Sequence, residues 1–408
     1  MWLIRITIAL LLLFGLQFYF LKKLNLSIKN IFKDSSDKKI KLFNKIFIII
    51  FNLYPLFLIL LLLYSLFTSN SRLNFPEGSL IDIALIFPFW VLLFIIVQSI
   101  LFFVIIDLIS LVIKLVRKSF REKIKKYNAV ISLLVVCFFT IYVPGRILYD
   151  YNTIGISTYN FVKNTLPDNL NGFKIVFISD MQADRYTTEK RLNKFVSLVN
   201  NEQPDLVLVG GDFITSTPNY INLSAEIAGK IKSKYGVYSC VGDHDNWAYR
   251  WDTKKSLTEV EEALLKKGVK MIDNDNITLS IDSSKIRITF ITNTYVQRIS
   301  NSILDSVVDK SNNYNLKIFL THQPRNFLIN KAKEYDYDLY LAGHTHGGQI
   351  SFLFPFINLS PTLIETKYVK GVFNFGNLKA IVTGGLGMSI APVRYNSTPQ
   401  INVINLIK

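Results

Sequence analysis

The first 150 residues contain four apolar stretches that are each long enough to cross a lipid bilayer as one helix, which takes about 20 residues. The first stretch lacks a small-residue cleavage site and runs directly into a Lys-rich segment, so we interpret it as a retained helix and not as a signal peptide. The third contains Pro88, which a membrane helix tolerates. We therefore expect residues 1–149 to form an all-α transmembrane region with helices over residues 2–21, 46–68, 83–106 and 128–147.

The loops between these stretches predict an orientation in the membrane. Residues 22–45 contain eight Lys and residues 114–126 contain seven Lys or Arg, whereas residues 69–80 contain only Arg72 and Glu77 as charged residues. Loops rich in Lys and Arg stay on the cytoplasmic side. Four spans then place both termini outside the cytoplasm, so we expect a multi-pass protein of the cell membrane with an extracytoplasmic C-terminal domain.

The net charge of +16 belongs mainly to the membrane region, since residues 1–150 carry 18 Lys and Arg against 7 Asp and Glu. Residues 151–408 carry 28 against 23, and no basic stripe alternates with aromatic residues, so the pattern is not that of a nucleic-acid-binding protein. No ionisable residue lies in the middle of an apolar stretch, where transport pathways usually need one. We expect the helices to anchor the chain in the lipid bilayer and not to form a transporter.

After an expected linker over residues 150–171, short apolar runs alternate with amphipathic segments. Repeated strand–helix–strand units indicate an α/β domain with a largely parallel sheet over residues 172–408. A capping box of Ser256 and Glu259 marks the start of the last predicted helix. Strands are predicted over residues 174–179, 205–209, 237–241, 277–282, 285–293, 316–320 and 339–342, and helices over residues 188–201, 221–233 and 256–267.

All four histidines of the chain, and several aspartates, follow directly after predicted strands. The carboxyl ends of parallel strands meet at one rim of a sheet, where ligands bind. Carboxylates and imidazoles suit divalent ions such as Mn, Fe or Zn, and six ligands are too many for one tetrahedral ion. Two ions about 3.5–4 Å apart, sharing a carboxylate, are a common arrangement for hydrolysing phosphate esters. The six candidate ligands are Asp180, Asp212, Asp243, His322, His344 and His346.

The order of these motifs resembles the calcineurin-like metallophosphoesterases over residues 172–404. The motifs are Asp180-x-Gln182, Gly211-Asp212, Gly242-Asp243-His244-Asp245, His322 and Gly343-His344-Thr345-His346. The run Gly343–Gln349 and the segments Gly384–Gly387 and Pro392–Arg394 are similar to a membrane-associated bacterial branch, and helices before such a domain are similar to transmembrane metallophosphoesterase-domain proteins.

This resemblance implies a two-sheet α/β sandwich with helices on its outer faces and a dinuclear metal site. Asp212 would bridge the ions. Asp180, Gln182 and His346 would hold one ion, and Asp243, His322 and His344 the other. His244 would protonate the leaving group, with Asp245 orienting it. The residue types favour the same role independently of the resemblance, because a His that lies beside a metal ligand and is followed by Asp suits acid–base catalysis near pH 7.

Two positions depart from the family pattern, which usually has His at position 182 and Asn at position 243. Gln182 offers a neutral carbonyl oxygen, which is a weaker ligand than imidazole, whereas Asp243 adds a negative charge. The donors therefore become harder and more anionic, and we expect two divalent ions with Mn²⁺ favoured, Fe, Mg²⁺ or Zn²⁺ being the alternatives. The ion beside Gln182 is expected to bind more weakly.

The metal motifs do not encode the substrate, but the membrane anchor favours a lipid-linked or envelope phosphate ester over a soluble nucleotide. The apolar run Phe352–Ile357 follows the last motif and is either a contact for acyl chains or the bilayer, or an ordinary buried strand. Arg394 is a candidate phosphate contact or a structural surface residue. We expect an enzyme that hydrolyses phosphate esters, and a phosphodiesterase in preference to a monoesterase. The alternative to an enzyme is a non-catalytic sensor domain that binds metal or phosphate. The sequence assigns no oligomeric state.

Overall fold

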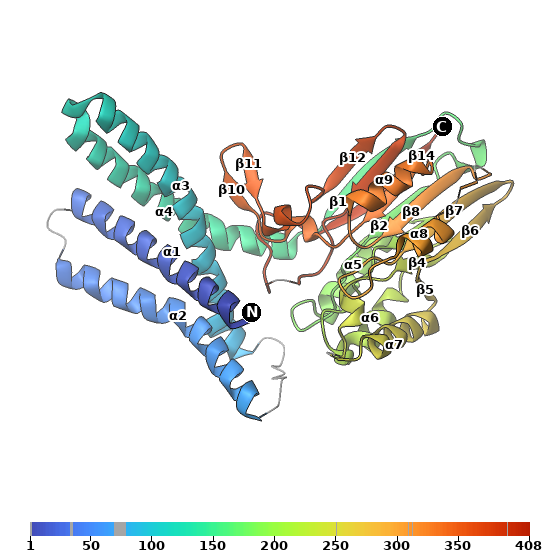
Figure 1. Cartoon of the computed structure of the whole chain (residues 1–408), viewed down its shortest axis with the longest axis horizontal. Helices are drawn as coiled ribbons and strands as arrows, with labels where there is room; N and C mark the ends of the chain where they lie inside the picture. Colours follow the sequence, from blue (N-terminus) through green and yellow to red (C-terminus); the bar gives the residue numbers. More distant parts are fainter. Residues whose placement is uncertain are drawn as a thin grey trace. The chain divides into compact units, whose positions relative to one another are not determined.

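The computed structural model describes residues 2–32, 36–68, 79–249, 251–308, 310–311, 313–389 and 391–408 (Figure 1). The chain packs into two compact units, which we describe separately. The first contains Met1–Leu148 and Phe352–Leu359, and the second contains Tyr149–Ser351 and Ser360–Lys408. Most of the loop over residues 69–80, with Arg72 and Glu77, lies outside the described residues.

The first unit is built on long apolar helices, α1 (Trp2–Ile31), α2 (Asp37–Thr68), α3 (Phe87–Val116) and α4 (Arg121–Asn152). Within the described ranges these four are long and apolar enough to cross a membrane, in line with the all-α region that the sequence predicts. A π-helical turn, Asp82–Ile86, precedes α3, and Pro88 lies in its first turn, where the missing N–H is not needed. The helices extend beyond the apolar stretches because the Lys-rich flanks are themselves good helix formers.

Aromatic side chains fill the space between these helices. Phe20 stacks on Phe47 and Phe103, with ring centroids 5.9 and 6.1 Å apart, and Phe51 stacks on Phe89 at 5.3 Å. Many Leu and Ile side chains on the opposite faces are exposed, as expected for helices surrounded by lipid and not by water.

The second unit is a sandwich of two mixed sheets, each with six strands in the described part of the chain. Their orders are β1-β14-β2-β3-β4-β5 and β12-β13-β9-β8-β7-β6. The strands are β1 (Gly155–Val162), β2 (Lys174–Ile178), β3 (Leu206–Val209), β4 (Val237–Cys240), β5 (Val269–Ile272), β6 (Asp275–Ile281), β7 (Ser284–Ile291), β8 (Leu316–Thr321), β9 (Leu339–Ala342), β12 (Gly371–Phe375), β13 (Leu378–Val382) and β14 (Gln400–Ile407).

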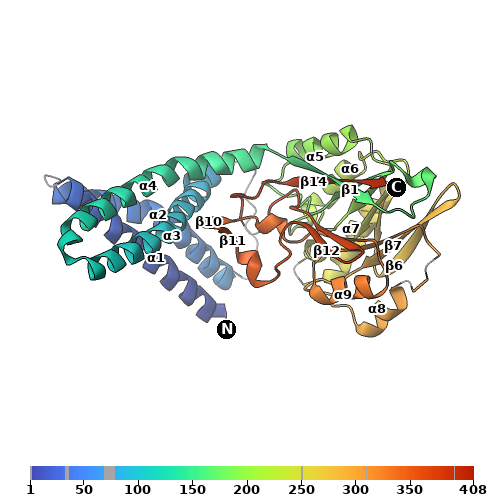
Figure 2. The same ribbon diagram turned by 90° about the horizontal axis from the view of Figure 1, so that it is seen from above.

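Helices cover both outer faces of the sandwich (Figure 2). The first sheet packs under α5 (Glu189–Asn201), α6 (Ile221–Ala228) and α7 (Thr253–Lys266), and the second under α8 (Asn301–Val307) and α9 (Asn326–Glu334). Successive side chains of β2 pack into two different hydrophobic cores. Val176 and Ile178 pack against the helices, whereas Ile175 and Phe177 pack against the other sheet. The expected two-sheet α/β sandwich is confirmed, and β2, β3, β4 and β5 run parallel.

Two local expectations need correction. Residues 155–162, placed in the linker, form β1 and pair with β14 over eight residues; this strand alternates between exposed and half-buried positions and therefore lacks an apolar run. Helix α7 begins at Thr253, and its cap is Asp252, whose carboxylate accepts from the Lys255 N–H, so Ser256 is not the cap. The run after the last motif forms a short hairpin of β10 (Phe352–Phe354) and β11 (Ile357–Leu359), grouped with the membrane helices.

Candidate metal centre

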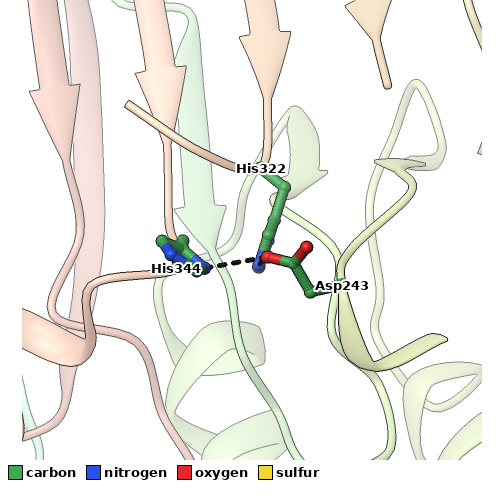
Figure 3. Close-up of side chains that lie close together, drawn as sticks. All are labelled: Asp243, His322 and His344. Carbon is green, nitrogen blue, oxygen red and sulfur yellow. Dashed lines mark ion pairs between the residues drawn. The ribbon is translucent and has the colours of Figure 1, made fainter. Parts of the chain in front are cut away.

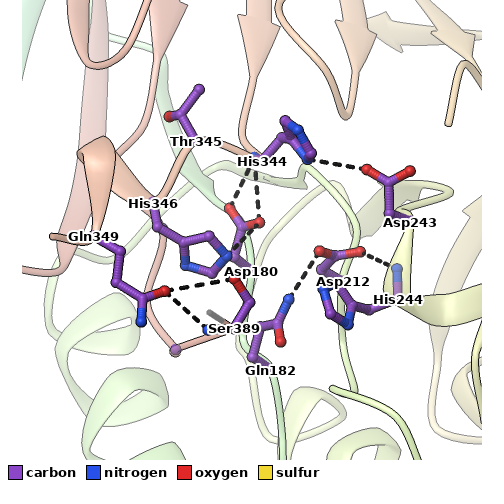
Figure 4. A network of polar contacts seen from close by, with 12 residues as sticks. Asp180, Gln182, Asp212, Asp243, His244, His344, Thr345, His346, Gln349 and Ser389 are labelled. Atoms are coloured by element: carbon purple, nitrogen blue, oxygen red, sulfur yellow. Dashed lines mark hydrogen bonds and ion pairs between the residues drawn. The ribbon is translucent and has the colours of Figure 1, made fainter. Parts of the chain in front are cut away.

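Five strands deliver the predicted ligands to one rim of the sandwich (Figure 4). Asp180, Asp212 and Asp243 follow β2, β3 and β4 of the first sheet, whereas His322 and His344 follow β8 and β9 of the second. The rim is therefore formed jointly by the carboxyl ends of parallel strands from both sheets, which is where the sequence placed it.

The backbone at this rim is held in a conformation that L-residues rarely adopt. Asp180, Gln182, Asp212, His344 and His346 all have φ between 49° and 69°. Such left-handed positions cost free energy in non-Gly residues and gather at functional sites, where the surrounding structure enforces them. The strain aims these side chains inward from the ends of their strands.

Two glycines make this close packing possible. A Cβ atom at Gly242 would lie 2.2 Å from an Asp212 carboxylate oxygen, and one at Gly343 would lie 1.9 Å from the Ser179 hydroxyl. Both distances are far below van der Waals contact. Glycine is therefore required at each position so that neighbouring strand ends can approach the carboxylates.

One group of ligands consists of Asp243, His322 and His344 (Figure 3). The His344 Nδ1 and His322 Nε2 atoms lie 3.0 and 3.4 Å from the same oxygen of Asp243. Burial raises the pKa of Asp243, but the interactions with the two neighbouring imidazoles outweigh it and lower that pKa. The carboxylate is thus held as an anion between two nitrogen donors.

A second group joins Asp180, Asp212 and His322. His322 belongs to both groups, because its Nε2 atom lies 3.3 Å from Asp212 Oδ2 as well as beside Asp243. His346 adds a further nitrogen, with Nε2 3.5 Å from Asp180 Oδ1. Burial, and then the nearby Arg394 cation, lower the pKa of His346, so its imidazole stays neutral, as a metal ligand must be.

The buried Nε2 atom of His322 tests whether a cation fits this site. The other ring nitrogen, Nδ1, lies 2.6 Å from the Gly210 carbonyl oxygen and donates to it, so in the neutral imidazole Nε2 carries the lone pair. Nε2 is fully buried without a hydrogen-bond partner and faces two carboxylate oxygens. A buried imidazole nitrogen and two carboxylate oxygens that converge at more than 3 Å suit a divalent cation, so the donor set fits the expected metals.

Gln182 lies among the ligands, but its amide is already engaged. Its Nε2 donates to Asp212 Oδ2 at 2.9 Å, and its Oε1 accepts from the Thr215 hydroxyl at 3.0 Å. The carbonyl oxygen, the only atom of this side chain that can ligate a metal, therefore faces Thr215. A half-turn of the amide would be needed to bring that oxygen toward Asp212.

His244 lies at the edge of this cluster with its ring fixed from two sides. Its Nδ1 is 2.5 Å from the Thr215 carbonyl oxygen, and its ring packs edge-on against Trp247 at 4.6 Å between centroids. A backbone carbonyl can only accept, so Nδ1 carries the hydrogen and Nε2 is available for proton transfer. The backbone N–H of His244 also donates to Asp212 Oδ1 at 2.7 Å, so this residue is hydrogen-bonded directly to one of the ligands.

Asp245 does not orient His244 as expected. Its buried carboxylate accepts the backbone N–H groups of Asp212, Phe213 and Gly242, all at 2.8–2.9 Å. These bonds hold the loops after β3 and β4 together. The Thr215 carbonyl occupies the orienting position, and sequence proximity was misleading because adjacent side chains in the short helical turn His244–Asn246 point in different directions.

Three residues that sequence reasoning missed support the ligands from behind. Glu365 Oε1 lies 3.1 Å from His344 Nε2 and also accepts from the Tyr295 hydroxyl at 2.6 Å, while Gln323 Nε2 donates to Asp243 Oδ2 at 2.7 Å. Despite its partial burial, Glu365 has its pKa lowered to about 2 through its hydrogen bond to His344. Carboxylates that fix the second nitrogen of a ligating histidine are a regular feature of metal sites. Of these three residues, only Gln323 could have been suspected from the sequence, because it directly follows the predicted ligand His322.

A cavity of about 550 Å³ opens beside these supporting residues. Arg298 and Arg325 line it, and Arg325 pairs with Glu365. The cavity thus combines cationic groups with side chains that contact the metal ligands. Its remaining lining residues are Asn293, Thr294, Tyr295, Ile299, Gln323 and Phe327.

Arg394 is not among the residues that line this cavity. It is fully buried, and its guanidinium donates to the carbonyl oxygens of His346, Gly384, Gly387 and Ser397 at 2.6–3.1 Å. Burial lowers its pKa to about 9. The guanidinium holds the His346 loop against the Gly384–Gly387 loop, so the structure contradicts its expected role as a phosphate contact.

The comparisons with known proteins agree on one kind of domain. The sequence profile of the family described as Calcineurin-like phosphoesterase matches residues 173–348. The chain is 30% identical over 254 residues to the metallophosphoesterase YkuE of Bacillus subtilis (strain 168), covering 61% of this chain and 85% of the relative. It is 25% identical over 244 residues to the phosphodiesterase YaeI of Escherichia coli (strain K12), covering 59% and 84%. Identity is 27% over 262 residues to the transmembrane protein with metallophosphoesterase domain of Danio rerio, covering 59% and 54%.

Proposed function

Because the chain belongs to the calcineurin-like metallophosphoesterase family, we propose that it is a membrane-anchored enzyme that hydrolyses phosphodiester bonds with two divalent metal ions. The observation that carries this proposal is the position of His322 Nε2, 3.3 and 3.4 Å from carboxylates of the two ligand groups. Because this nitrogen lies within 3.4 Å of carboxylates from both groups, the two groups are adjacent, as the ligands of a compact two-ion site must be, and such a site is suited to phosphate esters.

In this proposal Asp180, Gln182 and His346 hold one ion, Asp243, His322 and His344 hold the other, and Asp212 lies between them. The ions supply positive charge that stabilises the phosphoryl group in the transition state and lowers the pKa of water. Glu365 and Gln323 hold His344 and Asp243 in place. These supports fit the proposal because ligand orientation by a second layer of hydrogen bonds commonly changes metal affinity about 10–100-fold.

His244 is the proposed general acid. With Nδ1 donating to Thr215, the opposite nitrogen carries a second proton in the imidazolium form and delivers it to the oxygen of the departing alcohol, which is a poor leaving group without it; the neutral ring then regains a proton from solvent. Arg298 and Arg325 are the proposed contacts for the remaining phosphate oxygens, since both line the cavity beside Glu365. A diester is favoured because YaeI, a relative, is named a phosphodiesterase.

The substrate is proposed to be lipid-linked, which is supported by the hairpin Phe352–Leu359. This hairpin follows the His346–Gly348 turn in the chain, yet it packs with the membrane helices. Gln98 in α3 donates to the Leu353 carbonyl at 2.6 Å and accepts its N–H at 2.9 Å, and Phe94 packs edge-on against Phe352. The N–H and the carbonyl of Leu353 are therefore both hydrogen-bonded. Beside apolar helices, a backbone group without such a partner would cost free energy.

Metal-dependent hydrolysis by the full chain in detergent provides the direct test. We expect turnover of an aryl phosphodiester with Mn²⁺, loss of turnover with a chelator, and recovery on adding Mn²⁺ back. Stoichiometric Zn²⁺ with full activity would instead contradict the proposed preference for Mn²⁺. A panel of lipid-linked phosphodiesters should then be turned over faster than soluble ones of the same leaving group.

The extracytoplasmic location of the catalytic unit remains a proposal based on the basic loops. A reporter that is active only in the cytoplasm, fused after Lys408, is expected to be silent. Its activity would reverse the orientation while leaving the hydrolytic function untouched.

A non-catalytic sensor is the second candidate, and the Gln182 amide is the observation that favours it. That amide turns its N–H and not its oxygen toward Asp212, which weakens one ion site. A sensor would bind phosphate and metal with unchanged affinity after His244→Ala, and would show no turnover in either form.

A further inference from the structure

A second charged site lies in the membrane unit, and the proposed hydrolysis makes no use of it. A cavity of about 350 Å³ opens between α1, α3 and α4. It lies where the two basic loops of the sequence meet, since the C-terminal half of α1, the end of α3 and the start of α4 all contribute to its walls. Its lining residues are Tyr19, Lys22, Lys23, Leu26, Ser27, Asn30, Asp107, Lys114, Lys125, Asn128 and Ala129.

The floor of this cavity is a buried polar network. Lys23 is almost fully buried, and its ammonium group pairs with Asp107 and donates to Asn128 Oδ1 at 2.6 Å. Asp107 Oδ2 also accepts from the Tyr19 hydroxyl at 2.9 Å, and the Asn128 amide donates to Asp107 Oδ1 at 2.9 Å and to Ser110 at 2.8 Å. These bonds join three helices and fix the floor before any ligand arrives.

The walls carry positive charge that this network does not neutralise. Asp107 is the one acidic residue lining the cavity in the described part of the chain, against four Lys, so the lining has a formal charge of four minus one, or +3. Lys23 is committed to Asp107, which leaves Lys22, Lys114 and Lys125 around the opening. Three lysines from three different helices line a space large enough for a headgroup, where an anion would offset their positive charge.

Exposed apolar side chains lie on the same helices as the lysines. Leu26 lines the cavity and is half exposed, and on α3 the side chains of Leu111, Val112 and Leu115 are exposed as well. A soluble anion would use the lysines alone, whereas a phospholipid would also lay its acyl chains along these faces. The cytoplasmic leaflet, where the charge pattern places this end of the helices, is rich in anionic lipids, and basic pockets between helices on that side suit their headgroups.

We propose that this cavity is a binding site for the phosphate-bearing headgroup of an anionic membrane phospholipid. The phosphate is held by Lys22, Lys114 and Lys125, and the Lys23–Asp107–Asn128 network forms the base of the site. The site gives the membrane unit a specific lipid ligand in addition to its role as an anchor. It does not depend on the metal centre or on the proposed hydrolysis.

Binding of short-chain phosphatidylglycerol to the full chain in a neutral detergent tests the proposal. The cavity variant is Lys22→Gln/Lys114→Gln/Lys125→Gln. The matched control is Lys38→Gln/Lys39→Gln/Lys41→Gln, which removes the same charge from exposed positions outside the cavity lining. We expect the cavity variant to bind phosphatidylglycerol at least tenfold more weakly and the control less than twofold, with phosphatidylcholine binding weakly to all three proteins.

An equal loss of phosphatidylglycerol affinity in both variants would mean that the lipid is attracted by the overall surface charge, and this would contradict the proposed site. So would displacement of the lipid by equimolar inorganic phosphate, since that would identify a soluble anion as the ligand. A photoreactive phosphatidylglycerol supplies a second readout: labelling should map to Leu26 and Ser27 in the wild-type chain and disappear in the cavity variant. Labelling that persists there would also contradict the proposal. Unchanged thermal unfolding of the cavity variant would show that the lost binding is not a folding defect.

Discussion

The Nδ1 atom of His244 lies 2.5 Å from the carbonyl oxygen of Thr215, and this one contact determines which nitrogen of the ring can transfer a proton. Because the contact is to backbone, it does not depend on the type of side chain at position 215. Asp245, the neighbour in sequence, instead accepts backbone N–H groups of the loops after β3 and β4.

Replacing His244 with Ala should separate chemistry from metal binding. We expect about a 10²–10⁴-fold fall in kcat for diesters with an alkyl leaving group, because general acid catalysis typically contributes this much. Diesters with a nitrophenyl leaving group should lose much less, and the metal content measured by elemental analysis should stay constant. An equal loss for both leaving groups would show that His244 has another role.

Asp245→Asn should act on stability and not on the proton donor. The carboxylate accepts three backbone N–H groups in a fully buried position, and a neutral amide accepts them less well. We expect the free energy of unfolding to fall by about 2–4 kcal/mol, measured by denaturant titration of the second unit's unfolding in the full chain. The pH dependence of kcat in the remaining folded protein should match the wild type; a displaced profile would restore the expected orienting role.

Gln182→His should strengthen the weaker ion site, since imidazole is the better ligand and its lone pair can replace the engaged amide oxygen. Metal occupancy after dialysis against a limiting Mn²⁺ buffer is expected to rise toward two per chain. Gln203→His is a well-matched control, because Gln203 has φ of 51° against 50° for Gln182 but is exposed and not among the ligands. A similar rise in the control would point to unspecific binding.

Arg394→Lys keeps a cation but loses the fork that reaches four carbonyl oxygens. We expect lower metal occupancy and a fall in unfolding free energy of about 3–5 kcal/mol, the range for breaking a buried charged network. KM for the phosphodiester, measured with saturating Mn²⁺, should stay within twofold. A raised KM at unchanged stability would return Arg394 to the role of a phosphate contact.

Gln98→Leu should loosen the hairpin Phe352–Leu359, because both backbone groups of Leu353 lose their partner. Turnover of a lipid-linked diester in bilayers is expected to fall several-fold while turnover of a soluble aryl diester is unchanged. Gln17→Leu serves as control, since Gln17 is likewise buried in the membrane unit and bonds Asn52 instead. Equal effects on both substrates would mean that the hairpin supports the catalytic unit in general.

Sequence patterns alone determined the four membrane helices, the α/β class and the gathering of Asp180, Asp212, Asp243, His322, His344 and His346. These features depend on local composition and on the rule that parallel strands end at a common rim, both of which are visible along the chain. Only the tertiary structure decided that Thr215 orients His244, that Arg394 is buried under the His346 loop and that Glu365 supports His344. The hairpin on Gln98 and the lysine cavity around Asp107 also belong to this second group. Each of them joins residues far apart in sequence, and distances of this kind are set by packing, which leaves no periodic or compositional trace in the chain.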